Sequence, residues 1–453
     1  MRSSEIIYTD KSLKKHPTVN PEDVHEIIAR YMLADGFPIV PDLVNSKGIH
    51  MIDLLSGETF IDFFTFFASS PLGLNDPALN NESVKAELAE AAVNKPSNSD
   101  IYSLYMAEFV QAFSEIAKPD YMRYLFFVSG GTLAVENALK VAFDWKVRKN
   151  FIKGYKEEKG HKVIHFREAF HGRSGYTLSI TNTEPDKVKY FPKFNWPRIV
   201  NPKITFPLDK NIEEIIKLEK EAITQIHKAI KENPDDIAAI ITEPIQAEGG
   251  DNHFRKEFFE SLRQIADEND IMLIFDEVQT GFGLTGKFWA AEHFVQPDII
   301  AFGKKAQVCG IMASERVDEV DENCFHKSSR INSTWGGNLV DMVRAKHILY
   351  TIKDENLVLN SALQGKYLLS ELQKIQSGFP NLVSNARGIG LMCAFDLPDK
   401  ESRNKFRDLA FKEKLIILGC GERSIRFRPP LNVTEDGLNE GLKIIKKVLS
   451  LMS

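Results

Sequence analysis

Residues 271–305 read IMLIFDEVQTGFGLTGKFWAAEHFVQPDIIAFGKK, and two short apolar runs in this stretch are each followed by charged side chains. The first run ends at Phe275, before Asp276, and the second ends at Phe302, shortly before Lys304. The length and β-branched content of these runs predict buried parallel strands. Ligands bind at the carboxyl ends of strands in an open α/β sheet, so the acid and the amine are candidates for one site.

The same pattern extends toward the N-terminus, where three further apolar runs span residues 125–128, 163–166 and 237–242. Helical stretches separate them, and residues 212–230 repeat their apolar positions at helical spacing. This alternation predicts an α/β domain with a mostly parallel sheet and helices on both faces.

The two ends of the chain differ from this pattern. Residues 48–67 predict two strands joined by a turn at Ser56-Gly57. After about residue 340 we expect helices, then a strand-like segment at 387–396 and a final amphipathic helix over residues 434–451. We therefore expect three parts: residues 1–70 joining a smaller α+β domain, residues 71–338 forming the large α/β domain, and residues 339–453 forming most of the smaller one.

Composition narrows the class of protein. The 453 residues are 43% hydrophobic and 26% charged, which is ordinary for a globular chain. With 57 Lys and Arg against 63 Asp and Glu, the net charge is -6, so we expect no nucleic-acid partner. No apolar run approaches the roughly 20 residues that cross a bilayer, and residues 1–17 lack a signal-peptide core, so we expect neither a membrane partner nor export. The cysteines have no metal-site spacing and predict free thiols in the cytoplasm: Cys309, Cys324, Cys393 and Cys420.

A glycine turn follows the run at 125–128. Ser129-Gly130-Gly131-Thr132 leads into a helical stretch, and the free N–H groups at a helix start, with the helix dipole, favour a phosphate. The Thr132 hydroxyl adds a donor. A plain glycine turn with a threonine cap explains the same letters.

Other candidate residues also follow predicted strands. Phe170, His171 and Arg173 offer an aromatic face, an imidazole and a guanidinium, although an aromatic core and a structural histidine fit as well. Asp276 suits a helix N-cap, a structural ion pair or a ring nitrogen that must stay protonated, because a buried carboxylate needs a cationic partner. Lys304 is either solvated or a desolvated amine that can form a Schiff base.

One motif competes with this interpretation. Residues 281–286, GFGLTG, match the GxGxxG pattern of nucleotide-binding loops. However, the first glycine of that fingerprint belongs in the tight turn that leaves the strand, and here residues 276–280 intervene. Phe288 stands where a P-loop needs Ser or Thr. A nicotinamide-dependent dehydrogenase is therefore disfavoured.

Together, a glycine-rich phosphate turn, an aromatic face, a strand-end acid and a later strand-end lysine describe a site for pyridoxal 5'-phosphate. The lysine joins the aldehyde, and the acid keeps the pyridine ring protonated so that it can accept electrons. We expect no metal.

The order and spacing of several stretches resemble the class III pyridoxal-phosphate aminotransferases. These stretches are FFVSGGTLAVENALK, AFHGR, ITEPIQAEGGDNHF, IFDEVQTGFGLTGKFWA and DIIAFGKK, within about residues 48–435. The resemblance implies fold type I and a homodimer in which each active site is completed by the partner. Within the family, AFGKKAQVCGIMA and STWGGNLVDMVRA look most like the L-lysine 6-aminotransferases.

The resemblance also implies roles for particular residues. Lys304 is expected to be the Schiff-base lysine, with Lys305 as the fallback. Asp276 is expected to pair with the pyridine nitrogen. The other expected cofactor contacts are Gly131 and Thr132 at the phosphate, Phe170 on the ring, Gln279 near the phenolic oxygen and Thr334 at the phosphate of the neighbouring subunit.

Substrate contacts follow from the same resemblance. Arg426 is expected to bind the α-carboxylate of 2-oxoglutarate, although Arg423 or Arg428 can be mistaken for it. Arg173 is expected to bind the carboxylate of L-lysine. Glu248 is expected to neutralise Arg426 while the amine donor is bound and then to swing away. The expected reaction gives L-glutamate and 2-aminoadipate 6-semialdehyde, in lysine catabolism, and the alternative donors are 4-aminobutyrate and ornithine.

Overall fold

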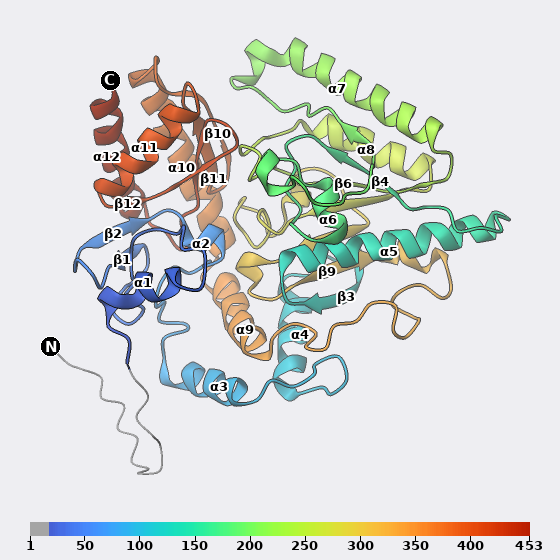
Figure 1. Ribbon diagram of the computed structural model, residues 1–453, viewed down its shortest axis with the longest axis horizontal. Helices are drawn as coiled ribbons and strands as arrows, with labels where there is room; N and C mark the ends of the chain where they lie inside the picture. The colour runs from blue at the N-terminus through green and yellow to red at the C-terminus, as the bar shows by residue number, and fades with distance from the viewer. Residues whose placement is uncertain (1–17) are drawn as a thin grey trace.

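A seven-stranded sheet lies at the centre of the computed structural model, which describes residues 18–453 (Figure 1). Its strand order is β3-β9-β8-β7-β6-β4-β5. The strands are β3 (Met122–Val128), β4 (Lys162–Phe166), β5 (Arg198–Ile199), β6 (Ile237–Thr242), β7 (Met272–Asp276), β8 (Ile299–Phe302) and β9 (Cys309–Ser314). All five predicted runs are strands of this sheet. They share one direction, because β9 is antiparallel to both β3 and β8.

Helices cover both faces of this sheet, as predicted. One face packs on α5 (Gly131–Ile152) and α6 (Gly175–Ile180). The opposite face packs into a larger cluster with α4 (Leu104–Ile116), α7 (Leu208–Glu232), α8 (Lys256–Glu268) and α9 (Leu339–Asp354). Alternate strand residues serve the two clusters: Ile274 of β7 joins the α5 side and Phe275 joins the other.

Two smaller sheets combine the ends of the chain. The first contains β1 (His50–Ile52), β2 (Thr59–Asp62) and β12 (Leu415–Ile416), and the second contains β10 (Ser384–Ile389), β11 (Met392–Asp396), β14 (Ser424–Phe427) and β13 (Leu418–Cys420). The helices beside them are α10 (Leu357–Gly378), α11 (Lys400–Lys412) and α12 (Glu435–Met452). The predicted N-terminal hairpin, the strands near residue 390 and the final helix are thus confirmed. Because β2 pairs with β12, the N-terminal segment joins the C-terminal part of the chain, as expected. The boundaries at residues 70 and 338 stay predictions, and α9, which begins at Leu339, packs on the helices of the large part.

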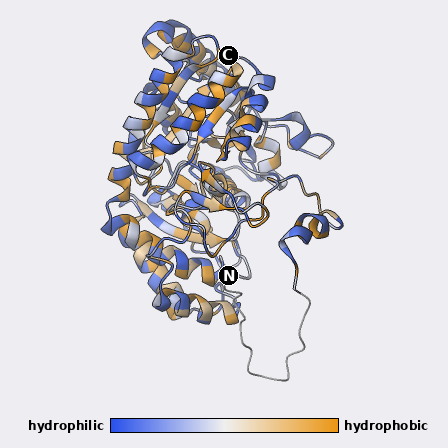
Figure 2. Ribbon diagram, turned by 90° about the vertical axis from the view of Figure 1, so that its left-hand side faces the viewer, coloured by the Kyte–Doolittle hydropathy of each residue, from blue (hydrophilic) through white to orange (hydrophobic). Residues whose placement is uncertain are grey.

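Hydrophilic and hydrophobic residues alternate along the helices (Figure 2), as expected of helices that cover a core. The remaining short elements are η1 (Pro21–Asp23), α1 (Val24–Ala29), α2 (Thr65–Ala68), α3 (Glu82–Val93), η2 (Pro185–Lys187), η3 (Ala290–His293), η4 (Lys304–Ala306) and η5 (Glu315–Glu319). In residues 18–453, no helix combines the length and the apolarity that a membrane crossing requires. The expectation about a signal peptide in residues 1–17 lies outside the described residues.

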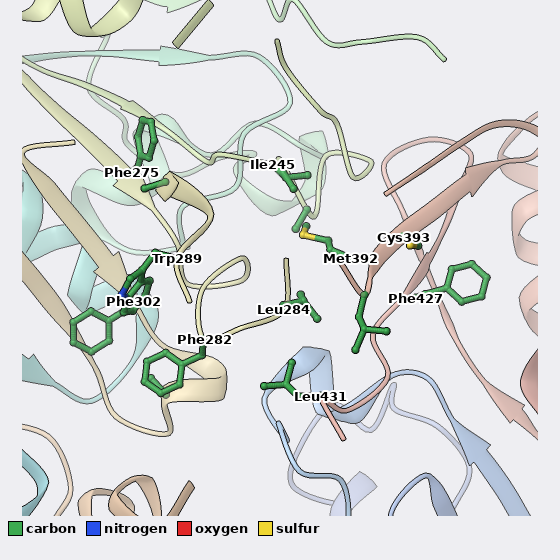
Figure 3. Packing of buried hydrophobic residues seen from close by; sticks show 14 of the residues in the cluster. Ile245, Phe275, Phe282, Leu284, Trp289, Phe302, Met392, Cys393, Phe427 and Leu431 are labelled. Carbon is green, nitrogen blue, oxygen red and sulfur yellow. The ribbon is translucent and has the colours of Figure 1, made fainter. Parts of the chain in front are cut away.

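The loop at residues 281–286 joins the central sheet to the C-terminal part. Phe282 and Leu284 are buried and lie between β7–β8 and Leu431 (Figure 3). The carbonyl of Leu284 accepts hydrogen bonds from the backbone of Leu391 and the hydroxyl of Ser361. This glycine-rich loop is a packed connection between two parts of the fold, so it offers no open cradle for a nucleotide phosphate.

Candidate active site

The edge of the central sheet brings the predicted acid and amine together. Strands β7 and β8 are parallel neighbours, and Asp276 is in register with Ala301. Lys304 follows three residues later, in the turn after β8. The pairing of two buried strands therefore places both side chains at the same carboxyl edge, as the sequence predicts.

The two adjacent lysines have different surroundings. Lys304 has a left-handed backbone (φ 51°), and its amine lies 5.5 Å from the centre of the Phe67 ring. Burial, followed by the positive charge of Arg426, lowers the pKa of Lys304 to about 8. The amine of Lys305 instead donates to the carbonyls of Gln279 (2.8 Å) and Ala68 (3.3 Å). The geometry favours Lys304 as the reactive amine and gives Lys305 a structural role.

Asp276 is held by a buried hydrogen-bond network. Its Oδ2 lies 2.8 Å from Nδ1 of His171, and its Oδ1 accepts from the backbone of Val278 (3.1 Å). Glu243 accepts from the backbone of Phe170, and burial, with the nearby charge of Asp276, raises the pKa of Glu243 well above its usual range. The sequence singled out His171, but it connected neither His171 nor Glu243 to Asp276.

The glycine turn after β3 lies against this network. A Cβ on Gly131 would stand 2.9 Å from Cγ1 of Val278, so the first turn of α5 approaches residues 276–279 as closely as a glycine permits. A Cβ on Gly172, where φ is +131°, would stand 2.4 Å from Oγ1 of Thr132. The cap of α5 is Gly130, which has no side-chain cap bond. Thr132 is therefore not the helix cap, and the helix N-terminus faces the site with backbone N–H groups.

Arg426 and Glu248 form an ion pair, with 2.9 Å between Nη2 and Oε2. The Arg426 side chain is 2% exposed, and in residues 18–453 its Nε and Nη1 are buried without a hydrogen-bond partner. Buried donors of this kind are costly, and a carboxylate would satisfy them. Arg426 therefore has the features of a binding site for an anionic ligand.

The two neighbouring arginines are used elsewhere. Arg428 makes a bidentate ion pair with the buried Asp251, with N–O distances of 2.9 and 2.5 Å, and also donates to Oε1 of Gln279 (3.1 Å). Arg423 is 49% exposed and lies 3.5 Å from Asp396. Only Arg426 of the three has buried, unpartnered N–H groups facing the site.

A strained turn supplies an aromatic wall that the sequence did not reveal. Residues 65–68 all have positive φ angles, from 43° to 62°, which is costly for non-glycine residues. Phe67 in this turn lies beside both Lys304 and Arg426, with 5.8 Å between its ring centre and the guanidinium carbon. The Phe67 ring therefore lies next to both the Lys304 amine and the Arg426 guanidinium.

The remaining predicted residues lie at different distances from this centre. Phe170 has the guanidinium of Arg173 at 5.9 Å and the amine of Lys187 at 5.3 Å from its ring centre, and Arg173 is exposed. Thr334 is also exposed, and its backbone carbonyl accepts from the Ser99 hydroxyl at 3.3 Å. Among the described residues, no hydrogen bond joins Thr334 to the other predicted site residues, and its expected role toward a neighbouring subunit stays a prediction.

Comparisons with known proteins agree over nearly the whole chain. The family described as "Aminotransferase class-III" matches residues 34–449. A Mycobacterium tuberculosis protein named L-lysine-epsilon aminotransferase is 49% identical over 98% of both chains. A human protein named mitochondrial 4-aminobutyrate aminotransferase is 31% identical, over 89% of this chain and 84% of its own. The solved structure described as lysine aminotransferase from M. tuberculosis in the internal aldimine form superposes with a TM-score of 0.94 at 49% identity, covering 96% of this chain and 100% of that one.

Proposed function

The chain belongs to the class-III aminotransferases, and on this premise we propose that it transfers the ε-amino group of L-lysine to 2-oxoglutarate. The products are 2-aminoadipate 6-semialdehyde and L-glutamate, and we propose a role in lysine catabolism. Relatives named for lysine share 45–49% identity with the chain, against 31% for a relative named for 4-aminobutyrate, and this difference supports lysine as the donor. Family membership confirms the predictions of an aminotransferase, of fold type I and of pyridoxal 5'-phosphate as the cofactor.

The residues of the site fit this cofactor. The α5 N-terminus at Gly131 and Thr132 offers backbone N–H groups for the phosphate, and Asp276 is a buried acid for the ring nitrogen. Phe170 offers an aromatic face. Gln279 follows three residues after Asp276, and its Oε1 accepts a hydrogen bond from Arg428. When bound, the cofactor supplies an electron-withdrawing ring that stabilises negative charge on the substrate carbon.

Lys304 has the properties of a general base. With a pKa of about 8, about a tenth of the Lys304 amines are neutral at pH 7. The neutral amine can take a proton from the carbon that carries the substrate amine and then donate it to the cofactor carbon bonded to the transferred nitrogen. Asp276, held by His171, is the buried acid that we propose for the ring nitrogen. The Lys304 amine and the Arg426 guanidinium lie 5.5 and 5.8 Å from the centre of the Phe67 ring, and this arrangement is the observation that carries the proposal.

Two arginines account for the two substrate carboxylates. The unpartnered N–H groups of Arg426 suit a carboxylate of 2-oxoglutarate, which must displace Glu248. Arg173 is exposed beside Phe170, where we propose that it binds the carboxylate of L-lysine at the site entrance.

We further propose a homodimer with shared active sites. Helix α1 extends away from the body of the molecule (Figure 2), and apolar side chains near it are exposed, including Tyr31 (84%) and Leu33 (86%). Thr334 and the half-exposed Trp335 belong to a second exposed segment. Exposed apolar side chains in such groups are typical of protein interfaces, and sedimentation velocity tests this association.

The four cysteines are free, which supports a reducing compartment such as the cytoplasm.

The test of the reaction is a donor panel. Purified holoenzyme receives L-lysine, 4-aminobutyrate or L-ornithine with 2-oxoglutarate, and L-glutamate is measured. We expect the highest kcat/KM for L-lysine and parallel initial-rate lines, because the enzyme releases one product before it binds the second substrate. A higher kcat/KM with another donor would reassign the substrate, and intersecting lines would contradict the two-step scheme.

A further inference from the structure

Lys187 is a second cation at the Glu248–Arg426 pair. It ends η2, in the segment after α6, and its side chain is only 10% exposed. Its Nζ lies 2.8 Å from Oε1 of Glu248, whereas Arg426 contacts Oε2 at 2.9 Å. The two cations therefore hold different oxygens of one carboxylate and come from different parts of the chain. No step proposed above uses Lys187.

Glu248 is the main charged partner of Lys187. The amine also lies 3.4 Å from the Thr183 hydroxyl and 3.7 Å from the carboxylate of Glu184, but Glu184 is 55% exposed and more distant. Burial opposes ionisation of Glu248, but Arg426 and Lys187 outweigh it and lower the pKa of Glu248 to about 2. Glu248 is consequently a carboxylate throughout the neutral pH range.

An ionised Glu248 creates a difficulty when a ligand binds. A substrate carboxylate on Arg426 must replace the Glu248 oxygen, and a partly buried carboxylate that loses its cationic partner is costly. Lys187 contacts the other oxygen, so this second contact can persist when the contact with Arg426 breaks. When Glu248 is displaced from Arg426, Lys187 is the one cation of the two that still contacts its carboxylate. Before displacement, Glu248 contacts both Arg426 and Lys187.

We propose that Lys187 is a positioning residue that keeps Glu248 paired while Arg426 binds the carboxylate of the keto acid. This proposal rests on the proposed function and assigns the amine that stabilises the displaced state of Glu248. Because the displaced state depends on Lys187 more than the paired state does, loss of Lys187 weakens keto-acid binding more than it affects the lysine step.

The direct test measures binding of glutarate, a dicarboxylate that cannot react, by calorimetry on the holoenzyme. Lys187→Met removes the charge and keeps most of the side-chain length, and Lys187→Gln is a second neutral variant in case the first folds poorly. We expect either variant to weaken glutarate binding about tenfold, because Glu248 is then displaced without its partner. Lys187→Arg should restore most of the affinity. The matched control is Lys189→Met, which removes an exposed lysine from the same segment.

Four outcomes overturn the proposal. Tighter glutarate binding by Lys187→Met would mean that Lys187 holds Glu248 on Arg426. Undiminished weakening by Lys187→Met in a Glu248→Gln background would mean that the amine contacts the ligand itself. Unchanged binding in the neutral variants, or no binding by the wild type, would remove the role altogether.

A kinetic measurement separates this proposal from the proposed function. In steady-state assays, Lys187→Met should raise the KM for 2-oxoglutarate by about tenfold, with a smaller change in the KM for L-lysine. Equal changes in both would indicate a structural role. If the wild type uses a different amine donor, the proposed donor is wrong, but the glutarate measurement still decides the role of Lys187.

Discussion

The lowered pKa of Lys304 makes a quantitative prediction about its reactivity. Burial and the charge of Arg426 lower this pKa from 10.5 to about 8. At pH 7 about a tenth of the Lys304 amines are then neutral, compared with about 0.03% for an ordinary lysine, so the reactive form is enriched about 300-fold. The neutral fraction rises with pH through 8 and levels off above about pH 9, because deprotonation is then almost complete.

The assay follows covalent attachment of pyridoxal 5'-phosphate to cofactor-free protein between pH 6 and 10. Borohydride fixes the product at each pH, and mass spectrometry identifies the labelled lysine. Free N-acetyl-lysine, measured in parallel, corrects for titration of the cofactor itself. We expect a corrected midpoint near pH 8 with the label on Lys304. A midpoint near 10.5, or labelling of Lys305, would refute the assignment and the electrostatic reasoning behind it.

Three further substitutions test other parts of the site. Arg426→Leu should lower kcat/KM for 2-oxoglutarate by roughly 10- to 150-fold, since charged hydrogen bonds contribute about 1.5–3 kcal/mol, whereas Arg423→Leu should stay near the wild type in the same assay. Asp251→Ala leaves Arg428 buried without its partner and should lower the free energy of unfolding in urea by about 3–5 kcal/mol; a loss below about 1 kcal/mol would contradict the importance of that ion pair. Gly172→Ala should destabilise the protein by roughly 1–3 kcal/mol, because φ is +131° there, and thermal unfolding at an unchanged midpoint would argue against that strain.

Much of the central sheet could be predicted because its strands are continuous apolar runs, for which burial on both faces is the simple explanation. Strand β9 was missed. Its sequence, CGIMAS, contains small and polar residues, and its antiparallel insertion between β3 and β8 depends on pairing across almost 200 residues of chain. Such long-range pairing has no local sequence signal.

The candidate site divides in a similar way. The sequence named Lys304 and Asp276 because each follows a strand, but it left Lys305 open, since the direction of two adjacent side chains depends on a local turn. It could not connect Lys187 to Glu248, because a lysine in a charged loop segment looks like an ordinary solvated residue. Only the tertiary fold brings the two side chains within 2.8 Å.

The buried loop at residues 281–286 has a consequence for engineering the chain. It begins two residues after Gln279, and its backbone is bonded directly to Leu391 in the C-terminal part. We expect an insertion in this loop to break the hydrogen bond between Leu284 and Leu391, which joins the central sheet to the C-terminal part. The same insertion would also displace the nearby Asp276. Inserted domains belong instead in mostly exposed turns such as residues 153–159.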